Sequence, residues 1–125
     1  RLADGWLGSF VTPDEAAVCR SQIEAAAAGA GREIEEDHYG TNLVVALDSA
    51  DERAIDAALA RAVSQRKDLA DPTGLVCRGW AAAREEIGRF VDAGLTKFVV
   101  RPAAPVTSRR DFLDQFTAEL LPLQT

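Results

Sequence analysis

The chain has 125 residues, of which 47% are hydrophobic and 27% charged, a balance typical of one globular domain with a hydrophobic core. Its net charge of -6 argues against a nucleic-acid partner, because phosphate binding needs a basic surface. The sequence contains no apolar run of the roughly 18 residues that a membrane helix needs, which argues against a membrane partner. The two cysteines, Cys19 and Cys77, lack metal-ligand spacing. We therefore expect a cytoplasmic protein.

The first predicted elements are a short strand, Gly5 to Phe10, and the helix that follows it. Thr12 and Glu15 have the spacing of a capping box, with a proline at the first helical position between them. Gly29 and Gly31 are expected to end this helix, because glycine tolerates the left-handed conformation found there. The apolar stripe of this helix consists of Ala16, Cys19, Ile23 and Ala27. Cys19 is expected to be a small buried hydrophobe on this stripe.

A second strand is predicted from Thr41 to Leu47. Its continuous apolar run, Leu43 to Leu47, is typical of a strand covered on both faces in a parallel sheet. Ser49 and Glu52 form a second potential capping box, and the helix that they open ends before a break at Asp71 to Gly74. The apolar face of this helix is expected to contain Ile55, Leu59 and Val63.

The remaining elements are a helix from Trp80 to Ala93, a strand from Leu95 to Val100, and a last helix. A glycine stops the first of these, and Arg101-Pro102 closes the strand. The last helix is expected to be capped near Ser108 and stopped by Pro122. The apolar side of the first helix is expected to contain Trp80, Ala83, Ile87, Phe90 and Val91. The last helix is expected to bury Phe112, Phe116 and Leu120.

This alternation of strands and helices predicts an α/β fold with right-handed βαβ units and a parallel sheet. Three such units are about three eighths of a (β/α)₈ barrel, but they also suit a small open sheet, and the pattern alone favours neither. The chain begins at Arg1 and contains no methionine, so we expect it to be a fragment of a longer protein.

Three stretches resemble segments of the luciferase-like monooxygenases and their F420-dependent relatives. They are Arg1 to Leu7 (RLADGWL), Ala25 to Arg32 (AAAAGAGR) and Glu85 to Pro102 (EEIGRFVDAGLTKFVVRP). The Phe- and Leu-rich helix from Asp111 also has a counterpart in that family. Each motif is moderately specific, but their order and spacing together extend the resemblance over nearly the whole chain.

The resemblance implies that residues 1–125 are a single segment, the C-terminal part of a TIM (β/α)₈ barrel, with Gly5 to Phe10, Thr41 to Leu47 and Leu95 to Val100 as the sixth to eighth strands. The complete barrel would be an oxidoreductase or monooxygenase that binds FMN or coenzyme F420 at the carboxyl ends of its strands and acts on a small-molecule substrate. Most cofactor-binding residues would lie upstream, so we expect no catalytic residue here and no turnover by this chain alone. The expected partners are identical subunits or the missing N-terminal part of the barrel.

The sequence also departs from the family. Many members have a Gly-Thr-Pro-Glu-Glu turn before the helix that precedes the last strand, whereas Arg78 to Ala82 here lacks the proline and the acidic pair. In the sugar-phosphate dehydrogenase branch, basic residues occupy the positions of Thr12 and a residue near Thr73. A sugar-phosphate substrate is therefore not expected.

Ser9 and Arg101 are the candidate cofactor-binding residues, because both are expected at carboxyl ends of strands. In members of the family that the chain resembles, a hydroxyl residue at the position of Ser9 contacts a cofactor or substrate phosphate. Ser9 is equally well explained as a turn serine that bonds its own backbone. The guanidinium of Arg101 suits an anionic cofactor tail or a substrate carboxylate, or else is a solvated charge at the rim.

The other residues with possible chemical roles are better explained structurally. His38 is the only histidine and is expected in a surface loop before the second strand, opposite the active-site end. Trp6 and Trp80 are expected in the core. The acidic run Glu33 to Asp37 lacks the ligand spacing of a calcium loop, and no metal site is predicted.

The main alternative is a small stand-alone α/β module for binding or assembly, without catalysis. Such a module needs charged or proline-containing edge strands. Leu43 to Leu47 has neither, which favours a strand with neighbours on both sides.

Overall fold

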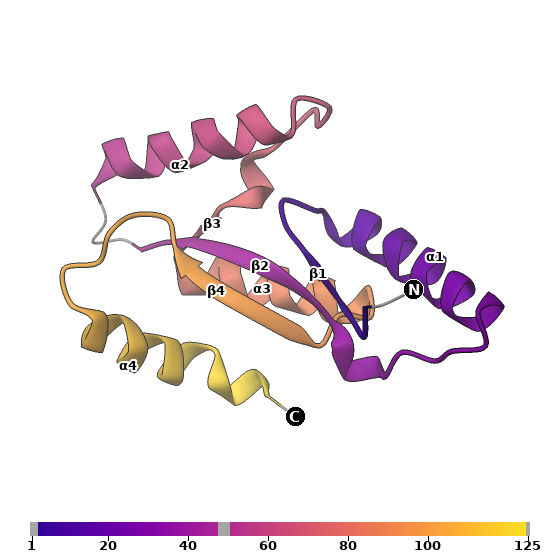
Figure 1. Cartoon of the computed structure of the whole chain (residues 1–125). Coiled ribbons are helices and arrows are strands. Elements are labelled where there is room, and N and C mark those ends of the chain that lie inside the picture. Colours follow the sequence, from indigo (N-terminus) through magenta and orange to yellow (C-terminus); the bar gives the residue numbers. More distant parts are fainter. Residues whose placement is uncertain (1–2, 48–50, 125) are drawn as a thin grey trace. The chain divides into compact units, whose positions relative to one another are not determined.

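Strands and helices alternate along residues 3–47 and 51–124, the part of the chain described by this computed structural model (Figure 1). The strands are β1 (Trp6–Gly8), β2 (Tyr39–Ala46), β3 (Cys77–Arg78) and β4 (Lys97–Pro102). The helices are α1 (Pro13–Gly29), α2 (Glu52–Gln65), α3 (Gly79–Asp92) and α4 (Arg109–Glu119). Short 3-10 turns are η1 (Glu36–His38), η2 (Thr73–Leu75) and η3 (Leu121–Leu123). The predicted α/β class is confirmed.

The sheet is built around β2, which pairs with each of the other three strands. Its pairings with β1 and β3 are parallel, with Val45 opposite Cys77 in the second. Thr96 N donates to Tyr39 O, and Ala103 N donates to Val45 O, so β4 advances along β2 in the same direction. The parallel pairing expected between the second and the last predicted strands, Thr41 to Leu47 and Leu95 to Val100, is therefore confirmed.

The described chain divides into two compact units. Unit 1 contains residues 3–42 and 87–99. Unit 2 contains residues 43–47, 51–86 and 100–124.

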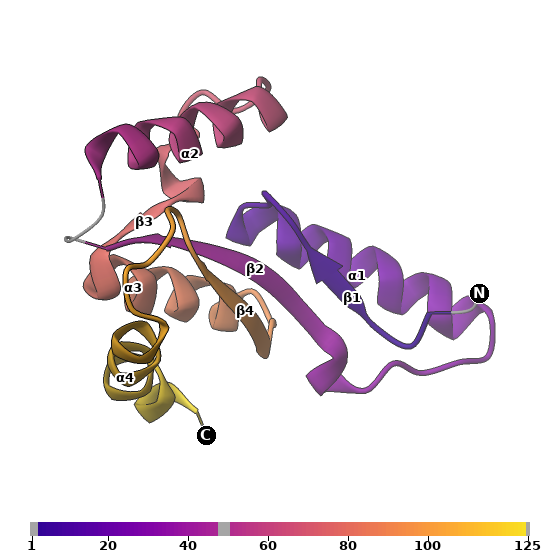
Figure 2. The same cartoon turned by 60° about the vertical axis from the view of Figure 1, so that its left-hand side comes forward.

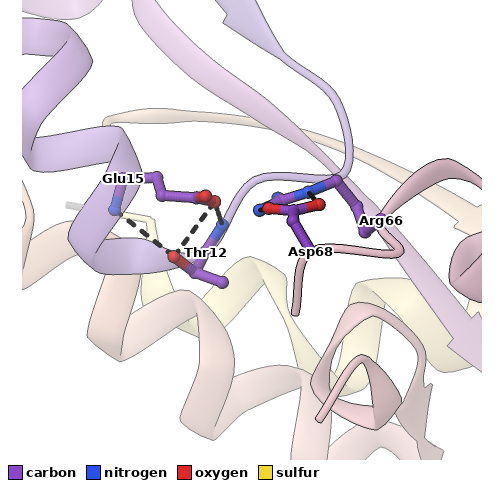
Figure 3. A network of polar contacts seen from close by, with 4 residues as sticks. All are labelled: Thr12, Glu15, Arg66 and Asp68. Atoms are coloured by element: carbon purple, nitrogen blue, oxygen red, sulfur yellow. Dashed lines mark hydrogen bonds and ion pairs between the residues drawn. The ribbon is translucent and has the colours of Figure 1, made fainter. Parts of the chain in front are cut away.

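In unit 1, α1 lies alongside β1 (Figures 1 and 2). The predicted capping box is present: Glu15 N donates to Thr12 Oγ1 at 3.3 Å, and Thr12 N donates to Glu15 Oε2 at 2.8 Å (Figure 3). On the predicted apolar stripe, Ala16 is buried but Cys19 is only half-buried. The prediction that Cys19 is a fully buried small hydrophobe was therefore wrong. This helix therefore presents a partly open apolar face.

The core of unit 1 is built on Tyr39, whose side chain is fully buried. The guanidinium of Arg20 lies 4.8 Å from the centre of the Tyr39 ring and donates a hydrogen bond to Gly94 O. Gly94 follows α3 with φ at +92°, a conformation that favours glycine, and its predicted role as the helix stop is confirmed. The rings of Phe90 and Phe98 lie 6.4 Å apart and connect α3 to β4.

The outer strands of unit 1 have exposed apolar side chains. Along β4 inward and outward positions alternate, so that Phe98 is half-buried while Lys97 and Val99 are exposed. Leu7 of β1 is 53% exposed. Trp6, expected in the core, is only half-buried.

In unit 2, α2 begins at Glu52, and its N-cap is Asp51, which accepts a hydrogen bond from Arg53 N. Ser49, the predicted cap, lies outside the described residues. The predicted apolar face is partly wrong, because Ile55 is buried but Val63 is 44% exposed. Eight residues rotate a helix about 80° beyond whole turns, so Val63 points past the face, and Ala62 is buried in its place.

The second half of unit 2 packs α4 against the start of α3. The rings of Trp80 and Phe112 lie 5.6 Å apart, and Trp80 Nε1 donates to Gln115 Oε1 at 2.9 Å. Trp80 is therefore half-buried with a polar partner and not a full core residue. Arg84 forms an ion pair with Glu119. Ser108 caps α4 as predicted, accepting from Asp111 N.

Several predicted boundaries and burials need correction. The first strand is shorter than Gly5 to Phe10, and β2 starts earlier than expected because Tyr39 already pairs with β1. The last strand starts after Leu95 and includes Arg101 and Pro102, since an outer strand tolerates a missing N–H. The helix α4 ends at Glu119, before the predicted proline stop. Side chains predicted to be buried but found half-buried or exposed are Leu59, Val91, Phe112 and Phe116.

Candidate functional site

The carboxyl end of β1 in unit 1 is the first candidate site. Ser9 follows the last residue of the strand and is exposed. The next residue, Phe10, has φ at +56°, the only positive value among the described non-glycine residues. Such conformations cost about 1–3 kcal/mol and concentrate at functional sites. The turn that presents Ser9 is therefore imposed by the surrounding structure.

Asn42 of β2 holds this turn. Its Nδ2 lies 2.6 Å from Ser9 Oγ and 3.3 Å from Gly8 O. Thr41 Oγ1 also donates to Gly8 O, at 3.3 Å. Sequence reasoning missed Asn42, although a polar Thr41-Asn42 pair directly before the apolar run was a visible signal.

Arg101, the second predicted site residue, is exposed on β4 in unit 2. Its side chain makes no ion pair or hydrogen bond with another residue in the described ranges, so its guanidinium is available for an anion. Ser9 and Arg101 belong to different units. That Ser9 and Arg101 lie together at the carboxyl-end opening of one barrel remains a prediction.

Unit 2 also contains a cavity of about 440 Å³ that the sequence did not reveal. This volume is within the range of small-molecule sites, and the cavity lies at the carboxyl end of β2, where α/β proteins bind ligands. Its remaining wall comes from the end of β4 and the start of α4. The lining residues are Val45, Leu47, Asp51, Pro102, Ala104, Pro105, Val106, Thr107, Ser108, Asp111, Phe112 and Gln115.

The charge around this cavity disfavours phosphate. Two carboxylates, Asp51 and Asp111, line it, and none of its described lining residues is Lys or Arg. Asp51 and Ser108 cap α2 and α4, so the N–H groups of Arg53 and Asp111 are already bonded and are not available to an anion. The cavity is therefore suited to an uncharged or cationic group with apolar surface.

The amino end of β2 carries a different polar cluster in unit 1. Ligand atoms of Glu35, Asp37 and His38 lie within 4.8 Å of one another. His38 Nδ1 is 2.6 Å from Asp4 O, which can only accept, and Lys97 Nζ is 3.3 Å from Asp37 Oδ2. The lysine already neutralises Asp37 and would compete with a bound cation. Because His38 precedes β2, it lies at the opposite end of the parallel strands from Ser9, as predicted.

Tyr39 has the unusual ionisation behaviour of a buried phenol. Burial raises its pKa above the ordinary value of 10.0, Glu24 raises it further, and Arg20 lowers it. Its hydroxyl has no hydrogen-bond partner among the described residues. A phenol that stays neutral is unsuited to proton transfer near pH 7.

No known family profile matches the chain, and no curated protein sequence is significantly similar to it. Within the described residues, none of the helices is both long and apolar enough to cross a membrane. Function is therefore inferred from the sequence motifs and from the geometry at the carboxyl ends of the strands.

Proposed function

We propose that this chain forms the last three β/α units of a luciferase-like (β/α)₈ barrel, an oxidoreductase or monooxygenase that binds FMN or coenzyme F420. The observation that carries the proposal is the sheet: β1 and β4 both pair with β2, β4 runs parallel to it, and a helix follows each of these three strands. Three consecutive units of a parallel barrel need this arrangement. The two-residue β3 is an addition before α3.

The outer strands support the same proposal. Among the described strands, β1 and β4 each have β2 as their only neighbour. Both carry large exposed apolar side chains, Leu7 at 53% and Val99 at 44%. Soluble proteins normally cover such edges and apolar residues, and further barrel strands would do so here.

The residues present suit one wall of a cofactor site. When bound, a flavin or deazaflavin ring supplies hydride chemistry. In this proposal Ser9 and Arg101 hold polar parts of the cofactor or substrate, while the cavity beside α4 takes an uncharged part, consistent with its two carboxylates. The resemblance assigns most ring-binding residues to the rest of the barrel, so this segment is not competent alone.

The test is titration of FMN and F420 into the whole protein that carries this chain, followed by fluorescence. Arg101→Ala removes a charged hydrogen bond worth about 1.5–3 kcal/mol, so affinity for the anionic ligand should fall about 10- to 100-fold. The melting temperature should stay nearly unchanged, because Arg101 is exposed. Arg61→Ala, at an exposed position of α2, is the matched control, and His38→Ala should leave binding unchanged. Absence of binding of both cofactors to the unaltered protein contradicts the proposal.

The second candidate function is a stand-alone α/β binding or assembly module. It is favoured by the outer strand β4, which carries Lys97, Arg101 and Pro102, residues that protect an edge from further pairing. The central strand β2 has neighbours as expected, so it does not discriminate between the two candidates.

A further inference from the structure

The amide of Asn42 has a fixed orientation. A carbonyl oxygen only accepts hydrogen bonds, so the Asn42 atom that lies 3.3 Å from Gly8 O must be the amide nitrogen. Exchanging the amide nitrogen and oxygen would place two acceptors against each other. The same nitrogen lies 2.6 Å from Ser9 Oγ, so the two amide protons go to Gly8 O and to Ser9 Oγ.

This orientation determines what Ser9 offers a ligand. Its oxygen accepts from Asn42, and its hydroxyl proton has no acceptor among the described residues. A hydroxyl carries one donor, so Ser9 presents a donor to any group that approaches its exposed side.

The surroundings favour an uncharged acceptor over a phosphate. Within the described residues, no Lys or Arg hydrogen-bonds to Ser9 or Asn42. At the start of the following helix α1, the N–H groups of Thr12 and Glu15 are already bonded within the capping box and are not available to an anion. Phosphate sites use several donors or cations, whereas one neutral O–H matches one carbonyl oxygen.

We infer that Ser9 donates a hydrogen bond to an uncharged carbonyl oxygen of the bound ligand, with Asn42 as the residue that positions its hydroxyl. This inference rests on the proposed function, in which the ring carbonyls of a flavin or deazaflavin are the available acceptors. It differs from the family expectation that a hydroxyl at this position contacts a phosphate.

The experiment compares FMN with riboflavin, which has the same ring carbonyls but no phosphate, in the whole protein. If F420 is the cofactor that binds, F420 is compared with its phosphate-free chromophore in the same way. Dissociation constants are measured by fluorescence for the unaltered protein, Ser9→Ala, Ser9→Thr and Asn42→Asp. Ser21→Ala, the same change at an exposed position of α1, is the control. Melting temperatures show whether each variant is folded.

Ser9→Ala should weaken FMN and riboflavin by the same factor, about 3- to 10-fold, and Ser9→Thr should restore most of the affinity. Asn42→Asp should weaken both by about tenfold or more, because the carboxylate accepts the hydrogen bond that the Ser9 hydroxyl would donate to the ligand and adds a negative charge beside the ligand carbonyl. The carboxylate also faces Gly8 O, so a merely structural role for Asn42 would show as a lowered melting temperature together with the loss of affinity.

Three results overturn the inference, and they are distinguishable. Loss of FMN affinity with unchanged riboflavin affinity assigns Ser9 to the phosphate. Unchanged affinity for both ligands leaves the proposed function standing and makes Ser9 a turn residue. Binding of neither flavin nor deazaflavin to the unaltered protein removes the proposed function and the inference with it.

Discussion

Replacing Tyr39 by Phe should stabilise the protein. The side chain is fully buried, and its hydroxyl has no partner among the described residues. A buried polar group without a hydrogen bond costs about 1–3 kcal/mol, and the change removes only that group. The ring stays beneath Arg20 and keeps its cation–π contact. We expect the free energy of unfolding to rise by about 1–2 kcal/mol, which raises the melting temperature by about 3–8 °C for a chain of this size.

The gain should grow at high pH. Burial raises the pKa of Tyr39 in the folded state above 10.0, so the unfolded chain ionises first as pH rises. The unaltered protein should therefore lose stability as pH increases through about 10 and above, toward the raised folded-state pKa. Tyr39→Phe has no such group, so the difference in stability between the two proteins should widen over that range.

Urea and thermal unfolding at several pH values measure both effects in the same protein. Thr41→Val is the matched control, because it also removes one buried hydroxyl, but Thr41 Oγ1 donates to Gly8 O at 3.3 Å. It should lower stability by about 0.5–1.5 kcal/mol. A loss of stability in Tyr39→Phe comparable to that in Thr41→Val would refute the reasoning, since it would mean that the phenol is satisfied.

Two further predictions concern polar side-chain contacts near α1 and after α2. Thr12→Ala should lower the free energy of unfolding, measured in urea, by about 0.5–2 kcal/mol, because it removes the cap of α1. Thr12→Ser keeps a capping hydroxyl and should be nearly neutral. An equal loss of stability in both variants would exclude capping as the cause. The side-chain hydrogen bond from Arg66 lowers the pKa of Asp68 to about 2 (Figure 3). This stabilisation is present above pH about 4 and is lost as pH falls toward 2, so Asp68→Asn should lower the melting temperature at pH 7 but not at pH 2.

The starts of α1 and α4 and the central strand were accessible from the sequence because their signals are local. Thr12 and Glu15 are three residues apart and cap α1 as predicted, and Ser108 caps α4 in the same way. The apolar run Leu43 to Leu47 predicted a central strand, and its residues are buried except for the half-buried Val44, while other strands pair with β2. Local chemistry is sufficient in these cases.

Other features depend on contacts between distant residues. The strand β3 has two residues and exists only through its pairing with Val45 and Ala46, so no local pattern marks it. The role of Asn42 depends on Ser9, which is 33 positions away in the sequence. The cavity beside α4 arises where β2, β4 and the following turn come together, and its lining residues lack a shared motif.

The most direct test of the central claim is the solution state of residues 1–125 expressed alone. If they are part of a larger parallel barrel, the outer edges of β1 and β4, with Leu7 and Val99, lack the strands that should cover them. Analytical ultracentrifugation and calorimetry should then find self-association or aggregation and a broad, weakly cooperative melt. A monodisperse monomer with a sharp cooperative transition would contradict the barrel proposal and favour the stand-alone module.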